Sequence, residues 1–131
     1  MVQSLWPDNI GVIDDSLSPF TLLQQQAHFL GERTQNLLKA EVSLIHVQEY
    51  STTKQYIYQF NLVAPLLDNY RFGLFHIRYP VGYWYPVIIN DGDQEFRIES
   101  AEALNQILRG IFFSKKTEVI VQSLIIHSKN H

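Results

Sequence analysis

The feature that most constrains this chain is a change in the period of its apolar residues. From Pro19 to about Ala40 they recur at the three- and four-residue spacing of an amphipathic helix. From Val42 to Ile98 they alternate in steps of two, the period of a β-strand. The helical period returns after Ser100. This order predicts an α+β fold with an antiparallel sheet between terminal helices.

The alternating region is divided by turn residues into four or five strands. The expected strands are residues 42–47, 55–62, 70–77, 87–89 and 95–98. Gly92 lies in an Asn-Asp-Gly-Asp turn that is typical of a hairpin, because glycine tolerates a positive φ. Strict alternation makes the third strand apolar on both faces, so we expect it to be central and covered on both sides.

The helices carry recognisable start signals. Ser18 and Ser100 are expected N-caps, and Pro19 suits the first helical position. The segment 115–128 has a helical spacing, but its Val119–Val121 run also suits a strand.

The expected architecture is one α+β domain over residues 1–131. A sheet of four or five antiparallel strands is flanked by an N-terminal helix and two C-terminal helices. Residues 1–17 form an extended arm or a short edge strand. Its candidate anchors are Trp6, Ile10, Val12 and Ile13. Either the helices cover both sheet faces, or all lie on one face and a second copy covers the other.

Composition narrows the function classes. The 131 residues match the size of one domain, and the net charge of −3 argues against a nucleic-acid binder. The absence of cysteine excludes disulfides, thiolate zinc sites and cysteine nucleophiles. The first residues lack the basic and apolar regions of a signal peptide, and no apolar run is long enough for a membrane span, so we expect a cytoplasmic protein.

Aromatic residues are concentrated in the second quarter and the middle of the chain, with 11 of the 17 between Tyr50 and Tyr85. Aromatics within strands are expected to form core. Four others fall at a loop that is interrupted by proline and glycine: Tyr79, Tyr83, Trp84 and Tyr85. Tyrosine and tryptophan are common anchors at interfaces. The first hypothesis is therefore a non-enzymatic interaction module, of accessory, inhibitor or immunity type, that binds a protein partner or a second copy through this loop.

The second hypothesis is a small-molecule site, in a binding protein or an enzyme, on the concave sheet face. Alternation places four residues with polar tips on shared faces: His46, Tyr56, Tyr58 and His76. Such groups in an apolar pocket are suited to ligand binding or acid–base chemistry. No carboxylate partner accompanies the histidines, so we assign no catalytic residue and no cofactor.

Two further patterns bear on a possible calcium site and on a basic pocket. The acidic residues from Asp91 to Glu102 have the spacing of a calcium loop, but Phe96 stands where the loop requires glycine, so we expect a hairpin and no metal. Arg71 and Arg78 fall on opposite faces by alternation, which makes a pocket using both improbable unless a bulge intervenes.

Overall fold

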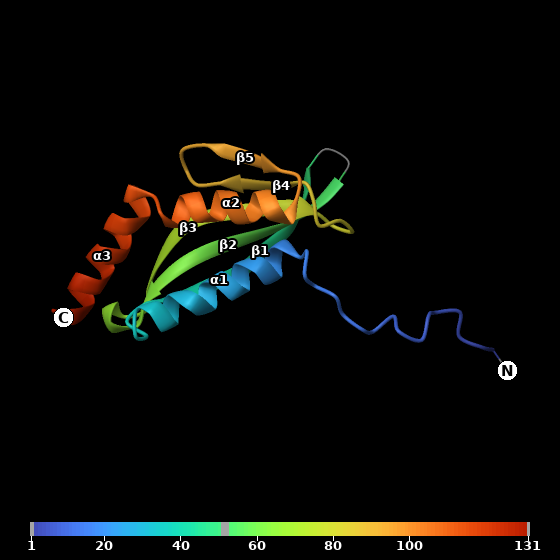
Figure 1. The fold of residues 1–131 in the computed structure, drawn as a ribbon, viewed down its shortest axis with the longest axis horizontal. Coiled ribbons are helices and arrows are strands. Elements are labelled where there is room, and N and C mark those ends of the chain that lie inside the picture. Colours follow the sequence, from blue (N-terminus) through green and yellow to red (C-terminus); the bar gives the residue numbers. More distant parts are fainter. Residues whose placement is uncertain (1, 51–52, 131) are drawn as a thin grey trace.

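The computed structural model describes residues 2–50 and 53–130, apart from the side chains of residues 46 and 48–50. Within these limits the chain forms an N-terminal helix, a five-stranded antiparallel sheet and two C-terminal helices (Figure 1). In chain order the elements are α1 (Pro19–Arg33), β1 (Lys39–Tyr50), β2 (Thr53–Ala64), the short 3-10 helix η1 (Pro65–Leu67), β3 (Tyr70–Pro80), β4 (Val87–Asn90), β5 (Glu95–Ile98), α2 (Ala101–Phe112) and α3 (Lys115–Lys129). The predicted fold class is confirmed.

The sheet is a meander in which the strands lie in the order β1-β2-β3-β4-β5. The β4–β5 connection is the hairpin expected from its turn residues. The Asp91 carboxylate accepts hydrogen bonds from the N–H groups of Asp93, at 2.9 Å, and Gln94, at 3.0 Å. Gly92 has a φ of +96°, which few other residues adopt without strain. The acidic turn is thus explained by hairpin geometry.

A β-bulge interrupts β3 at Leu74. Phe60 of β2 lies opposite Phe75, whereas the next β2 residue, Asn61, lies opposite Gly73. Leu74 therefore has no partner of its own in β2. An extra residue of this kind shifts the alternation of every residue beyond it.

The bulge changes which residues share a face. Phe72 packs against the same core as Phe75 and Ile77, although simple alternation separates them. Arg71 and Arg78 lie together on the other face of the sheet. The expectation that β3 is apolar on both faces is wrong for this reason, since β3 has one apolar face with a bulge in the middle.

β1 carries a second bulge at Ile45. Leu44 lies opposite Tyr58, and His46 lies opposite Ile57, so Ile45 is the unpaired residue. Beyond it, alternation brings Val47 to the same face as Leu44.

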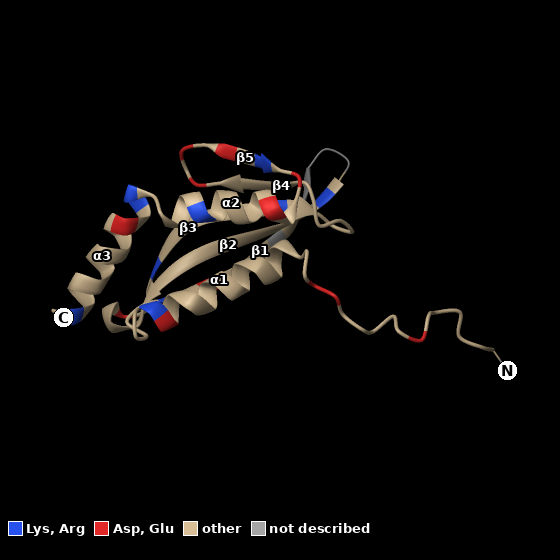
Figure 2. Cartoon of the chain, in the orientation of Figure 1, with Lys and Arg blue, Asp and Glu red and all other residues tan. Residues whose placement is uncertain are grey.

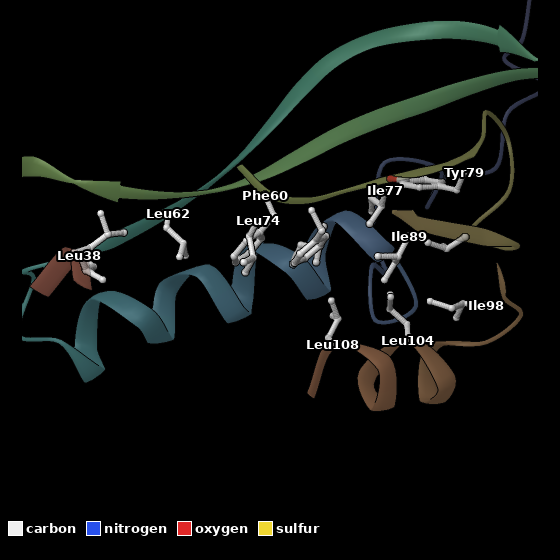
Figure 3. Packing of buried hydrophobic residues seen from close by; sticks show 14 of the residues in the cluster. Leu38, Phe60, Leu62, Leu74, Ile77, Tyr79, Ile89, Ile98, Leu104 and Leu108 are labelled. Atoms are coloured by element: carbon white, nitrogen blue, oxygen red, sulfur yellow. The ribbon is translucent and has the colours of Figure 1, made fainter. Parts of the chain in front are cut away.

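The main core lies on one side of the sheet. Leu62 and Leu74 point from the sheet toward α1, and Leu104 and Leu108 of α2 point toward the sheet (Figure 3). Leu23 of α1 and Leu104 of α2 are both fully buried in this cluster. Phe60 stacks on Phe75 with ring centroids 4.9 Å apart and lies 5.5 Å from Phe112 of α2. The arrangement with α1 and α2 on opposite faces is therefore wrong, because they share a face; α3 contacts α2, η1 and β2.

α1 ends at Arg33 and not near Ala40 as its apolar spacing indicates. Gln35 and Asn36 have φ values of 50° and 63°, so the backbone turns left-handed and leaves the helix. The turn passes close to Gly31, where an added Cβ would lie 3.3 Å from Asn36 Oδ1.

The ambiguous segment 115–128 is helical. Ser114 caps α3 by accepting a hydrogen bond from the Thr117 N–H at 3.2 Å. In the described residues, no helix combines the length and the apolarity that crossing a bilayer requires.

Residues 2–17 form an arm without strand structure that extends away from the sheet and helices (Figure 1). Its candidate anchors Trp6, Ile10, Val12 and Ile13 are 63–83% exposed, so the expectation that they hold the arm against the fold is wrong.

Candidate functional site

Of the four residues of the small-molecule hypothesis, the three whose side chains are described do not converge on one face. Tyr56 and Tyr58 lie on the helix-covered face, where the Tyr58 ring is 4.9 Å from Phe20 of α1. His76 lies opposite Gln59, on the other face. The side chain of His46 lies outside the described part of the chain. The bulge in β3 separates His76 from the tyrosines.

Tyr79 belongs to the core and not to the surface. Its side chain is 3% exposed, and its ring lies 5.5 Å from Tyr56 and 6.0 Å from Tyr58. Burial, followed by the neighbouring Tyr58, raises the pKa of the Tyr79 hydroxyl above its ordinary value. Burial also raises the pKa of Tyr58. Both hydroxyls therefore stay protonated near neutral pH, which suits packing better than proton abstraction.

The loop after β3 exposes two of the other three aromatic residues. Tyr83 is 68% exposed and Trp84 is 44% exposed. Tyr85 is half-buried, and its hydroxyl is buried without a hydrogen bond to any described residue. Of the residues predicted to bind a partner, Tyr83 and Trp84 are thus the two that present their rings to solvent.

These two rings continue into an apolar surface at the end of the sheet. Tyr83, Trp84 and Tyr56 line an open hollow of about 560 Å³. Tyr56 lies opposite Val47 in the β1–β2 pair, and the next pair along this face joins Tyr58 to Leu44. We call this continuous area the tip surface. It consists of Leu44, Val47, Tyr56, Tyr83 and Trp84.

The tip surface is exposed because the β1–β2 hairpin extends past the first turn of α1 (Figure 1). Leu44, Ile45 and Val47 are each about half exposed, at 48–50%. Sequence reasoning missed Leu44 and Val47 because it assigned them to opposite faces of the strand. The available signal was the adjacent apolar pair Leu44-Ile45, which breaks alternation where the bulge lies.

A second hollow, which we call the helix hollow, opens between α1 and α3. Its volume is about 510 Å³, and Phe60, Leu62 and Leu74 of the sheet line it. Arg33 and Gln122 are polar members of its lining. None of the residues predicted from sequence to bind a ligand contributes to it.

The face opposite the core carries charged and polar pairs. Arg71 Nε lies 3.0 Å from a Glu41 carboxylate oxygen, and Arg78 Nη1 lies 3.4 Å from Glu95. On this face burial, and then the positive charge of Arg78, lowers the pKa of His76. Among the described residues, no three His, Cys, Asp or Glu side chains are placed to hold a metal ion.

No protein-family model matches the sequence, no curated protein matches it significantly, and no solved structure matches it significantly.

Proposed function

We propose that this protein is a non-enzymatic interaction module, of the accessory, inhibitor or immunity type, that binds an extended polypeptide segment on its tip surface. The observation that carries the proposal is the continuity of five apolar and aromatic side chains at an exposed end of the sheet. Contiguous exposed patches of this kind mark interaction sites more often than isolated apolar residues do. Tyr83 and Trp84 supply the large amphipathic rings that are typical of binding hot spots.

The edge position of β1 favours an extended partner segment. β1 is the first strand in the sheet order, so one side of its backbone has no neighbouring strand among the described residues. Exposed edges are normally protected by lysine, proline or bulges. β1 contains no proline, its single basic residue of the Lys or Arg type is Lys39 at its start, and its one bulge is at Ile45. An extended peptide that adds to such an edge gains main-chain hydrogen bonds, while its side chains fill adjacent hollows.

The test is selection of random 12-residue peptides on the protein, followed by affinity measurement by fluorescence anisotropy. We expect the enriched peptides to alternate apolar and polar residues. Trp84→Ala and Val47→Asp should each weaken binding by about tenfold or more. Tyr70→Ala is the matched control, because Tyr70 is also half exposed, at 50%, but pairs at the opposite end of β2. Unchanged affinity in both tip variants would remove the proposal.

A second candidate function is binding of a small apolar molecule in the helix hollow. The observation that favours it is the volume of about 510 Å³ above an apolar floor, within the range of ligand pockets. Val121→Trp should fill the hollow and abolish enhancement of the fluorescence of 1-anilinonaphthalene-8-sulfonate. Val119→Trp is the control, since Val119 is on the same helix but 52% exposed. Equal dye binding by the two variants would place the dye elsewhere and exclude this function.

A further inference from the structure

We propose that the segment bound by the tip surface is the arm, residues 2–17, of a second copy of this chain, so that two copies exchange arms. The inference rests on the proposed function of the tip surface and names its partner. It joins two apolar surfaces that the single chain leaves exposed.

The arm is rich in apolar side chains that contact no core. Seven large ones are 53–97% exposed, namely Val2, Leu5, Trp6, Ile10, Val12, Ile13 and Leu17. A segment with this density of exposed apolar residues is suited to docking on another surface. The arm has no helix or strand to lose on binding, and only the turn at residues 8–11, in which the Ile10 N–H donates to the Pro7 carbonyl and the Val12 N–H to the Asn9 carbonyl, has to open.

Hydrogen bonds at the base of the arm direct it away from its own fold. The Asp15 carbonyl accepts a bond from the Ser18 N–H at 2.9 Å, and the Asp15 carboxylate accepts one from the Thr21 hydroxyl at 3.1 Å. The Asp14 carboxylate accepts a bond from the Ser16 N–H at 3.2 Å. These contacts join the last arm residues to the first turn of α1, and the arm leaves in the direction away from the sheet (Figure 1). A second copy is therefore a better acceptor than the same chain.

The base of the arm also lies beside the surface that would receive an arm. Phe20, in the first turn of α1, contacts Tyr58, which is adjacent to Tyr56 on the same face. Each copy thus presents its donor segment and its acceptor surface at the same end of the molecule. A two-fold axis between two such ends lets both arms bind at once, which closes the assembly as a dimer.

Charge and size are consistent with this pairing. The arm contains Asp8, Asp14 and Asp15 and no lysine or arginine, and Figure 2 shows only acidic segments along it. Lys54 is a basic residue beside the tip surface, since its carbonyl accepts a hydrogen bond from the Val81 N–H at 3.0 Å. The 16 arm residues and 5 tip residues give each copy 21, within the roughly 20–30 residues a side of a stable interface.

The first test is the molar mass of the full chain by light scattering and analytical ultracentrifugation at about 1–100 μM, the range over which micromolar dimers dissociate. We expect a dimer for the unmodified protein. The arm variant Val12→Asp/Ile13→Asp and the tip variant Val47→Asp/Trp84→Ala should each be monomeric. The control Val119→Asp/Ile126→Asp changes two side chains on α3 that are 52% and 57% exposed, and it should remain dimeric. A monomeric unmodified protein, or a dimeric arm variant, would overturn the exchange.

The second test combines the two monomeric variants. In a 1:1 mixture, the intact arm of the tip variant can bind the intact tip surface of the arm variant, so a heterodimer should form. A fluorescein-labelled peptide of residues 2–17 should likewise bind the arm variant and not the tip variant. Absence of both the heterodimer and peptide binding would refute the inference even if the variants were monomeric for another reason. If library peptides still bind the tip surface of a monomeric protein, the exchange fails while the proposed function stands.

Discussion

At the residue scale, the Tyr85 hydroxyl is a buried polar group whose hydrogen-bonding capacity is unused. It makes no hydrogen bond to a described residue, and burial raises its pKa. A buried hydroxyl without a partner costs about 1–3 kcal/mol. We therefore expect Tyr85→Phe to raise the free energy of unfolding by about 1 kcal/mol in urea denaturation. Tyr58→Phe is the control and should lower it, since the Tyr58 hydroxyl bonds with Tyr79.

Gln59 and Gly73 form a second residue-scale pair, at the bulge in β3. The Gln59 side-chain amide donates to the Phe75 carbonyl at 3.1 Å and lies across Gly73, where an added Cβ would be 2.7 Å from Gln59 Nε2. Gly73→Ala must displace this amide, so we expect it and Gln59→Ala to cost about 1 kcal/mol each.

A double-mutant cycle in urea checks this contact. Once Gln59 is Ala, the extra methyl group at position 73 has no amide to displace, so the double variant should lose less stability than the sum of the single variants. Simple additivity would show that the amide does not support the bulge.

At the element scale, the junction of α2 and α3 depends on two hydroxyl groups. Ser114 Oγ accepts the Thr117 N–H and lies 2.8 Å from the Ile111 carbonyl oxygen, to which the Thr117 hydroxyl donates at 2.7 Å. Ser114→Ala should cost about 1 kcal/mol, the usual contribution of an N-cap. Circular dichroism during urea denaturation measures it, with Ser114→Asp as a capping-competent control that should recover stability. Equal losses for both variants would contradict a capping role.

Element type and order were predictable because each element has a clear apolar period, while boundaries and faces were not. Leu37 and Leu38 continue the helical spacing of α1 by coincidence, since Leu38 is fully buried only after the chain has turned at Gln35 and Asn36. The bulges at Ile45 and Leu74 depend on pairing with β2, and alternation within one strand does not report pairing.

The residues of the candidate site were likewise predictable only where the sequence marks the type of element. Tyr83 and Trp84 could be identified because the neighbouring proline and glycine residues mark a loop. His76 was grouped with Tyr58 because the β3 bulge was not visible in the sequence. The contribution of β1 to the tip surface was missed because the bulge at Ile45 is not visible in the sequence either.

At the scale of the whole molecule, His76 should make stability depend on pH. Burial and then Arg78 lower its pKa in the folded state below the ordinary value of 6.5. The unfolded chain then binds a proton more readily, so the free energy of unfolding should fall as the pH drops below about 6.5, down to the folded-state pKa. Urea denaturation at several pH values between about 4.5 and 7.5 should show that the free energy of unfolding changes less steeply with pH in His76→Gln than in the unmodified protein.

The pH range in which His76 affects stability differs from that of the carboxylates. Burial alone would raise the pKa of Asp91, but the N–H groups of Asp93 and Gln94 hold it below 3.8, so its contribution is lost only under more acidic conditions. An unchanged slope in His76→Gln above about pH 4.5 would assign the dependence to other groups.

The strand order bears on how the chain reaches this structure. Every strand lies beside the strand that precedes or follows it in sequence. Each hairpin therefore closes over a short stretch of chain, which carries a small loss of entropy and favours rapid folding. The sheet can therefore form one hairpin at a time, without first bringing distant parts of the chain together.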